Sequence, residues 1–268
     1  MRAWHAVAGL AACGTAFTGV RTVAGRPISS AQSLSAAGIG LGAAGLMVHQ
    51  WLSPRSRLYG PVFWHARTPR RVMALTFDDG PCHPFTEQLL EVLDQERVRA
   101  TFFLPGENVR REPELAAEVS SEHAIGNHTF THPYLTWHGT RKIREELQRA
   151  QVEIQDATGR IPNLFRTPHG WYGPQVISTA QDLGLRCVGW SVMAWDWNRP
   201  PADTIRHRIL RGSSPGGISL LHDGQDTTTF PEADRSRTIA AVPRIIESLR
   251  EEGYSFVTVP DLISLDRP

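Results

Sequence analysis

The sequence is poor in cysteine and has almost no net charge, and each shortage excludes a class of protein. Its three cysteines, Cys13, Cys82 and Cys187, are too few and too widely spaced for a disulfide framework or a cysteine zinc site. With 28 basic and 27 acidic residues, the chain creates no overall field that would attract nucleic acid. No glycine-rich fingerprint follows a predicted strand, so a nucleotide site has no support either.

The chain is nevertheless long and apolar enough to bury a sizeable core. Its 268 residues, 41% of them hydrophobic, fit one large α/β domain with an appendage. A disordered chain would need a far lower hydrophobic content.

The first 52 residues differ in composition from the rest. Residues 3–20 and 28–52 contain no charged side chain, and each run could cross the roughly 30 Å hydrocarbon layer of a membrane as a helix. The small residues of "GIGLGAAG" would let two such helices approach closely. The alternative, a signal peptide followed by a low-complexity linker, lacks a clean cleavage site. We therefore predict a membrane anchor of two apolar helices over residues 1–52, a linker over 53–70 and a folded domain over 71–268.

The topology of this anchor depends on a small difference in arginine count. If both runs span the membrane, both ends lie on one side with Arg2, Arg55 and Arg57, whereas Arg21 and Arg26 lie in the connection. Because the ends have three arginines and the connection has two, the positive-inside rule weakly favours cytoplasmic ends. The topology stays open on this evidence.

From Arg71 onward, short apolar runs alternate with longer segments of helical periodicity. The apolar runs predict the strands of a covered parallel sheet, at residues 72–77, 100–104, 123–127, 163–167, 185–190, 217–222 and 254–259. Helical patterns occupy residues 84–96, 113–121, 140–158, 174–183, 202–211 and 235–252. Seven strands alternating with helices predict an α/β fold, either a barrel or an open doubly wound sheet.

Polar motifs follow five of the predicted strands. Asp78 and Asp79 follow the first strand, "NHTFTH" the third, "RTPHG" the fourth, "WDW" the fifth and "LLHD" the sixth. In a barrel, the loops after the strands converge on one face, where active sites are built. The motifs therefore predict one polar site at that face.

The pair His128 and His132 indicates a metal site within this cluster. Their i, i+4 spacing would place both imidazoles on one side of a helical turn. Two histidines and one carboxylate are a common ligand set for catalytic zinc. If Asp79 completes the set, Asp78 lies beside a cation that favours its ionised form and lowers the pKa of a water it could deprotonate. Each motif alone could be structural, but together they favour metal binding.

The motifs "TFDDG", "HTFTH", "RTPHG", "WDW" and "LLHD", in this order, resemble those of the NodB-like polysaccharide deacetylases, carbohydrate esterase family 4. The likeness covers about residues 71–262. It implies a distorted (β/α) barrel of about seven strands that removes acetyl groups, mostly from N-acetylated sugars and sometimes from O-acetylated ones. It also implies a divalent metal, usually zinc, and an N-acetylated carbohydrate polymer or oligomer such as peptidoglycan or a chitin-like chain as the partner.

The resemblance assigns a role to each motif residue. Asp78 would be the catalytic base, and Asp79, His128 and His132 the metal ligands. His222 would be the general acid that protonates the leaving amine.

Five further residues would support these groups. Arg166 would orient the base, a role that its planar, permanently charged group suits. Asp196 would hold His222 and keep it protonated, and the backbone N–H of His169 would help to stabilise the oxyanion. Trp197 and Leu220 would form the walls of the acetyl pocket.

Two positions depart from the family pattern. His169 stands where the family usually has an aromatic residue, which could change contacts with the sugar but not the backbone N–H. Met193 stands where the fourth motif commonly has an additional Asp, which leaves open how that loop is held. Cys82, close to Gly80, could be inert or regulatory.

The motifs determine the substrate and the location of the protein less directly than the chemistry. Five tryptophans near the motifs could pack in the core or stack on sugars: Trp137, Trp171, Trp190, Trp195 and Trp197. We predict a membrane-anchored enzyme with an extracytoplasmic domain that acts on a surface polysaccharide. A cytoplasmic domain acting on a lipid-linked precursor is one alternative, and a catalytically silent carbohydrate-binding protein is another. The sequence indicates no oligomeric state.

Overall fold

Nine short strands form the sheet in the part of the chain that the computed structural model describes, residues 60–225 and 234–267 with Gly38, Gly42 and Gly45. The strands are β1 (Val72–Ala74), β2 (Thr76–Asp78), β3 (Thr101–Leu104), β4 (Ala124–Asn127), β5 (Leu164–Phe165), β6 (Arg186–Cys187), β7 (Val192–Met193), β8 (Gly217–His222) and β9 (Ser255–Phe256).

Eight α-helices alternate with these strands between Gly60 and Arg267. They are α3 (Phe85–Gln95), α4 (Gly106–Arg111), α5 (Pro113–Glu122), α6 (Thr140–Thr158), α7 (Pro174–Asp182), α8 (Ala202–Gly212), α9 (Ser236–Glu251) and α10 (Val259–Leu265). Short 3-10 turns lie at Leu135–Trp137 (η2), Pro168–Gly170 (η3) and Asp196–Asn198 (η4).

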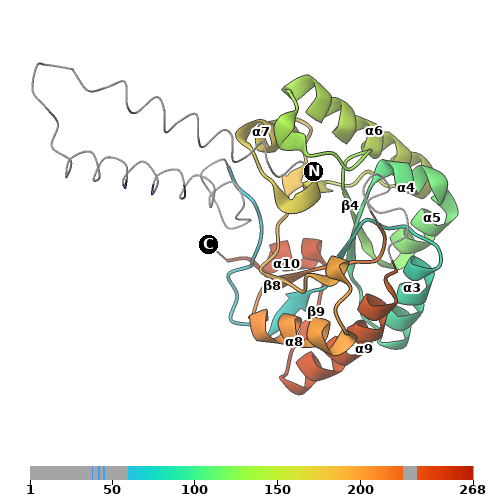
Figure 1. The fold of residues 1–268 in the computed structure, drawn as a ribbon, viewed down its shortest axis with the longest axis vertical. Coiled ribbons are helices and arrows are strands. Elements are labelled where there is room, and N and C mark those ends of the chain that lie inside the picture. Colours follow the sequence, from blue (N-terminus) through green and yellow to red (C-terminus); the bar gives the residue numbers. More distant parts are fainter. Residues whose placement is uncertain (1–37, 39–41, 43–44, 46–59, 226–233, 268) are drawn as a thin grey trace, which may run out of the picture. The chain divides into compact units, whose positions relative to one another are not determined.

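The strands pair in parallel in the order β6-β5-β4-β3-β2-β8-β1-β9, and β7 pairs with the free side of β8. The helices α7, α6, α5, α3, α9 and α8 follow one another around this sheet (Figure 1). The described strands show no pairing between β6 and β7. The architecture is therefore α/β with a parallel sheet, consistent with a barrel that is incompletely closed, and the α/β prediction is confirmed.

Burial on both faces explains why the strands are apolar runs. Every residue of β1, β2 and β3 is buried, as is all of β8 except its last residue, His222. The main core cluster joins Phe77, Phe102 and Leu221 of three neighbouring strands to leucines and isoleucines of the surrounding helices. Since no face is left for water, polar residues are tolerated only at the strand ends or with internal partners.

Local signals set several helix ends. The helix α6 has the predicted bounds, and it stops at Gly159, whose φ of 69° gives the left-handed cap that favours glycine. The helix α10 begins at a capping box in which Thr258 and Asp261 bond to each other's backbone N–H groups.

Two predicted strands were wrong in extent, and two elements were not predicted. The predicted strand 72–77 divides at Leu75 into β1 and β2. Both halves pair with β8 on one edge, but on the other edge β1 pairs with β9 and β2 pairs with β3. The predicted strand 254–259 ends at Phe256, since Val259 already belongs to α10. No pattern in the sequence predicted β7 or α4, which are only two and six residues long.

The predicted membrane anchor over residues 1–52 lies outside the described residues, apart from three glycines. In the described part of the chain, no helix has the length and apolar character needed to cross a membrane. Within the predicted linker, residues from Gly60 onward contact the sheet: Phe63 N–H donates to Cys187, and Ala66 N–H to Gly216, both at 2.9 Å.

Candidate active site

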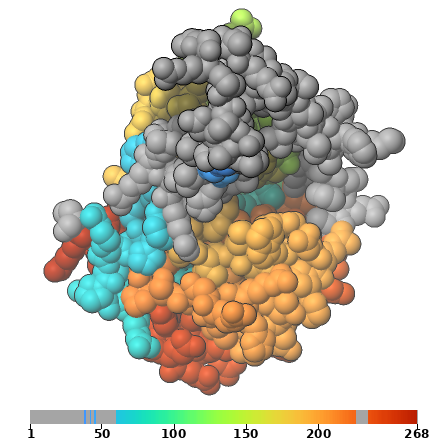
Figure 2. Space-filling view, turned by 60° about the vertical axis from the view of Figure 1, so that its left-hand side comes forward, coloured from blue at the N-terminus to red at the C-terminus, as the bar shows by residue number. Residues whose placement is uncertain are grey.

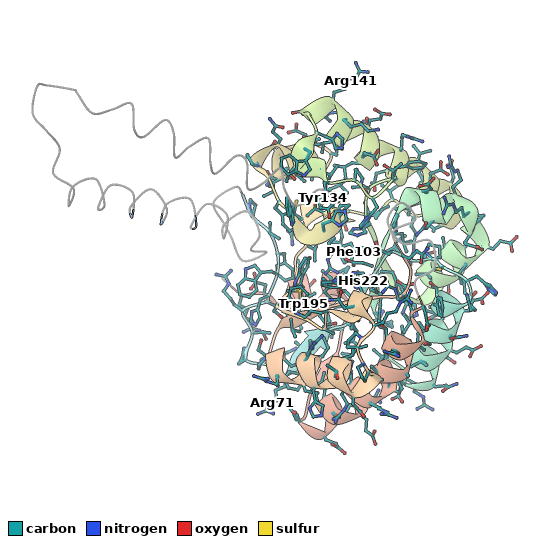
Figure 3. The ribbon with its side chains drawn as sticks, viewed as in Figure 1. Arg71, Phe103, Tyr134, Arg141, Trp195 and His222 are labelled. Carbon is teal, nitrogen blue, oxygen red and sulfur yellow. The ribbon has the colours of Figure 1, made fainter. Side chains whose placement is uncertain are left out.

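The polar motifs meet at the carboxyl ends of neighbouring strands. Asp78 and His222 are the last residues of β2 and β8, which pair directly with Asp78 opposite His222. His128 follows β4, and Arg166 follows β5. Because parallel strands end at the same edge, residues far apart in the sequence come together there, around the middle of the view in Figure 3.

Asp79 leaves the strand in a left-handed conformation, with φ of 73°. Adjacent side chains on an extended strand would point to opposite faces. After this turn, instead, both carboxylates approach the same imidazole: His128 Nε2 lies 3.9 Å from Asp78 Oδ2 and 3.4 Å from Asp79 Oδ1. The two adjacent carboxylates therefore serve one site.

The turn after β2 packs against Asp223, the residue that follows β8. Asp223 is buried and accepts a 2.6 Å hydrogen bond from the Thr86 hydroxyl. A Cβ on Gly80 would lie 2.0 Å from Asp223 Oδ2, so only glycine fits there. Burial raises the pKa of Asp223 to about 7, with the nearby charges of Asp79 and Asp78 adding to the effect.

Asp79, His128 and His132 form a buried cluster whose candidate ligand atoms all lie within 4.8 Å of one another. Asp79 Oδ1 lies 3.4 Å from His128 Nε2 and 3.2 Å from His132 Nε2. That oxygen is buried and has no hydrogen-bond donor. Burial alone would raise the pKa of Asp79, but the neighbouring charges, first that of His132 and then that of His128, outweigh it and hold the pKa far below its usual range.

The orientation of His128 also suits a metal. Its Nδ1–H donates to the carbonyl oxygen of Arg166 at 2.8 Å, which leaves the lone pair of Nε2 toward Asp79. A second ring nitrogen bonded to a backbone carbonyl is the usual support of a histidine ligand. The buried orphan oxygen and the two-histidine, one-carboxylate donor set therefore fit a divalent cation such as zinc.

The predicted helical turn between the two histidines was wrong. Residues 128–134 form a loop in which Thr129 and His132 have φ of 67° and 57°. The loop is held by Glu146 of α6, whose carboxylate accepts hydrogen bonds from the N–H groups of Phe130 and Thr131. The two imidazoles still come together, with ring centroids 4.9 Å apart.

Arg166 is fully buried and bonds directly to Asp78. Its Nη1 donates to Asp78 Oδ1 and to the Thr76 hydroxyl, both at 2.7 Å, and its Nη2 donates to the carbonyl oxygen of Gly189 at 2.9 Å. The guanidinium plane also covers the ring of Phe103 at 4.1 Å. These contacts fix one oxygen of Asp78 and leave Oδ2 toward His128.

On the opposite side of the site, His222 is paired with Asp196. Its Nδ1–H donates to Asp196 Oδ1 at 2.9 Å, and its backbone N–H donates to Oδ2 at 2.8 Å. The Thr238 hydroxyl of α9 donates to the same Oδ2 at 3.0 Å. Burial by itself lowers the pKa of His222, but the charge and hydrogen bond of Asp196 outweigh it, so the pKa is raised.

The three predicted substrate-binding residues lie around these groups. Trp197 packs edge-on against His222, with ring centroids 5.3 Å apart. Leu220 is buried two residues before His222 on β8, so both side chains project from the same face of the strand. His169 has φ of 59° and lies between His132, at 4.6 Å, and Tyr134, on which it stacks at 3.7 Å.

The tryptophans differ in whether they pack in the core or have a ring exposed to stack on a sugar. Trp190 packs against a core cluster and lies 5.7 Å from the Arg166 guanidinium. Trp137 and Trp195 are 70% and 46% exposed, whereas Trp171 and Trp197 are half-buried. Only exposed rings can stack on a ligand.

The structure adds residues that the sequence reasoning missed. Asn108 is buried and donates to the carbonyl oxygens of Asp79 and Gln225 at 2.7 and 3.3 Å, joining the loops that follow β2 and β8. It follows β3, so the signal used for the other motifs could have found it. Thr238 lies on the last long helix, where no pattern marks it.

The loop that follows Met193, whose support the sequence left open, is held by two contacts. Arg208 of α8 donates to the carbonyl oxygen of Ala194 at 2.8 Å. The backbone N–H of Arg199 donates to the carbonyl oxygen of Asp196 at 2.9 Å. Burial raises the pKa of the Cys82 thiol, which supports the inert interpretation of that residue.

An α/β sheet that presents a carboxylate, a histidine–aspartate pair and a metal-ligand cluster at one edge is typical of metal-dependent hydrolases. The family model for polysaccharide deacetylases matches residues 65–188. A peptidoglycan-N-acetylglucosamine deacetylase of Bacillus cereus is 36% identical over 210 residues, which cover 76% of this chain and 93% of that protein. A chitooligosaccharide deacetylase of Sinorhizobium fredii is 37% identical over 69% of this chain and 89% of its own length.

Solved structures agree with these relatives. The crystal structure of the Bc1960 peptidoglycan N-acetylglucosamine deacetylase superposes with a TM-score of 0.72 at 32% identity and covers 77% of this chain and 95% of that one. A carbohydrate esterase family 4 pseudoenzyme of Bacillus anthracis gives a TM-score of 0.70 at 28% identity, over 81% of this chain and 72% of its own. The chain therefore belongs to the polysaccharide deacetylase family, which confirms the resemblance seen in its motifs.

Proposed function

We propose that the protein is a zinc-dependent deacetylase that hydrolyses the acetamide of N-acetylglucosamine residues in peptidoglycan or a chitin-like chain. The observation that carries the proposal is the placement of a base candidate, an acid candidate and a metal-ligand cluster at one edge of the sheet. Several relatives are named for peptidoglycan or chitooligosaccharide substrates, which supports this substrate class.

Asp78 acts as the general base through Oδ2. Arg166 already occupies Oδ1 with a 2.7 Å hydrogen bond, so Oδ2 is the oxygen that can accept a proton from water. A positioned base of this kind contributes roughly a hundred- to ten-thousandfold in rate. A divalent cation held by Asp79, His128 and His132 would lower the pKa of that water and polarise the acetamide carbonyl.

His222 acts as the general acid through Nε2. Its Nδ1–H is committed to Asp196, so the other ring nitrogen carries the proton for the leaving amine. As the water oxygen bonds to the carbonyl carbon, Asp78 takes its proton, and the C–N bond breaks when His222 protonates the nitrogen. The products are acetate and a free amino sugar.

The remaining residues bind the acetyl group. The backbone N–H of His169 donates to the developing oxyanion, a contribution of about 3 to 4 kcal/mol for one such donor in other hydrolases. Trp197 and Leu220 provide the apolar wall for the acetyl methyl, because both lie against or beside His222.

The membrane anchor over residues 1–52, the linker over 53–70 and the extracytoplasmic location of the domain over 71–268 remain part of this proposal. Their support is the two uncharged runs of the sequence and the surface polysaccharides for which relatives are named.

The experiment is acetate release by the full chain from chitooligosaccharides and from peptidoglycan, after treatment with a chelator and after addition of zinc. Zinc-restored release from either substrate supports the proposal, and the ratio of rates ranks the two. Binding of the polymer without any release would instead favour the silent carbohydrate-binding alternative, for which the Bacillus anthracis pseudoenzyme is a structural precedent.

A further inference from the structure

A second concave site lies beside the loop that carries Asp196. It is a groove of about 650 Å³ between β7 and α8, lined among others by Met193, Trp195, Asn198, Arg208 and Arg211. Residues 188–191 join β6 to β7 without an intervening helix. The groove lies where α8 packs against β7, beside the side of the sheet that β6 and β7 leave unpaired.

The charge of the groove is positive. Arg208 and Arg211 are its only charged lining residues, and no carboxylate lines it. Within the described part of the chain, neither guanidinium forms an ion pair; Arg208 donates from one Nη to the carbonyl oxygen of Ala194. Since a guanidinium has five N–H donors, both side chains retain donors for a ligand. Both arginines are exposed on α8, which lies in the orange surface of Figure 2.

Two aromatic rings in contact link the groove to the candidate active site. Trp197 lies against His222 at 5.3 Å, and the ring of Trp195 lies 5.1 Å from that of Trp197. Trp195 is 46% exposed and also lines the groove. In Figure 3, Trp195 and His222 are labelled close together near the centre of the view. A polymer strand whose acetamide reaches His222 would therefore extend over Trp195 into the groove.

We propose that this groove is a subsite for a carboxylate-bearing part of the substrate strand, adjacent to the sugar that is deacetylated. Trp195 offers an apolar face to a sugar ring, and Arg211 with Arg208 binds the carboxylate, a group whose geometry matches the guanidinium fork. The inference rests on the proposed function and refines it. It predicts that an acidic glycan such as peptidoglycan, whose peptide stems carry carboxylates, binds more tightly than a neutral chitin-like chain.

Equilibrium binding tests this subsite separately from turnover. The probes are a soluble peptidoglycan strand, the same strand with its carboxylates converted to amides, and a neutral chitooligosaccharide of equal length. The proteins are the full chain, Arg211→Gln, Arg208→Gln and the control Arg141→Gln. Arg141 is an exposed arginine on α6 that points away from the site in Figure 3.

We expect Arg211→Gln to weaken binding of the acidic strand roughly fivefold, with little effect on the amidated and neutral chains. Arg208→Gln should act in the same direction, Arg141→Gln should have no effect, and added salt should weaken only the binding of the acidic strand. Equal affinity of wild type for the acidic and amidated strands would overturn the inference, as would equal effects of Arg211→Gln and Arg141→Gln. Acetate release is measured in parallel: charge-dependent binding without release would contradict the proposed function and leave the subsite standing.

Discussion

The Asp196→Asn variant gives the sharpest test of the proposed acid. Asp196 accepts three hydrogen bonds, two from His222 and one from Thr238, and it is buried. Asparagine keeps the shape but replaces one acceptor oxygen with a donor, so a buried donor loses its partner. We expect a loss of about 3 kcal/mol in the free energy of unfolding. For a domain of this size, this corresponds to a melting temperature lower by roughly 10 °C.

The same change should shift the pH dependence of turnover. The pKa of His222 is raised above the ordinary 6.5 because Asp196 outweighs the effect of burial. The acid must be protonated, so the wild type keeps activity above that pH and loses it as the pH rises through the raised pKa. In Asp196→Asn both contributions of Asp196 are lost and burial is opposed only by the charge of Asp79, so the pKa of His222 falls and the alkaline limb of kcat moves to lower pH. Near neutral pH the loss should approach the roughly hundred- to ten-thousandfold contribution of a general acid.

The pairing also affects stability in a predictable direction. The raised pKa of His222 contributes stability that is fully present below its unfolded pKa and is lost as the pH rises through the folded pKa. The lowered pKa of Asp196 contributes stability that is present above its unfolded pKa and is lost as the pH falls through the folded pKa. Asp196→Asn removes both contributions.

The assay is kcat for acetate release by the full chain, measured from acid to alkaline pH for wild type, Asp196→Asn and Asp203→Asn. Asp203 is an exposed aspartate of α8 that pairs with Arg244, so its variant controls for the loss of one negative charge. An alkaline limb that stays in place while kcat falls equally at every pH would refute the reasoning. Asp196 would then support the loop without setting the protonation of His222.

Three further predictions follow from the same geometry. His128→Ala and His132→Ala should each weaken zinc affinity by more than tenfold in calorimetry, whereas Asp78→Asn should bind zinc and lose turnover; equal zinc loss in all three would contradict the roles. Gly80→Ala should lower the free energy of unfolding by about 1 to 3 kcal/mol, because its Cβ would lie 2.0 Å from a buried carboxylate oxygen. In the control Gly139→Ala the Cβ meets nothing within 4 Å, so the free energy of unfolding should change little. Similar melting temperatures for both variants would show that the turn at Gly80 adjusts to the added Cβ without loss of stability. Removal of the metal by a chelator should stop acetate release and lower the melting temperature, both reversed by zinc; a melting temperature that does not change would indicate that no metal had been bound.

The sequence determined the helices and most strands, because their signals are local. The helix Thr140–Thr158 has an amphipathic pattern that ends at a glycine, and both of its bounds were predicted. The strands β3, β4 and β8 are apolar runs followed by polar motifs, and they lie where they were expected. The two-residue strand β7 has no pattern of its own, since only pairing with β8 makes it a strand.

The candidate site divides in the same way. The sequence supplied the chemical types: two carboxylates, three histidines and an arginine, each at or after the end of a strand. The tertiary structure decided which oxygen of Asp78 faces Arg166, an interaction between residues 88 positions apart. It also placed Asn108 and Thr238 in contact with site residues, and it placed Arg208 and Arg211 of α8 along a groove. Local patterns report whether a residue belongs in a strand, a helix or a turn, whereas partners depend on segments that meet only after the sheet has formed.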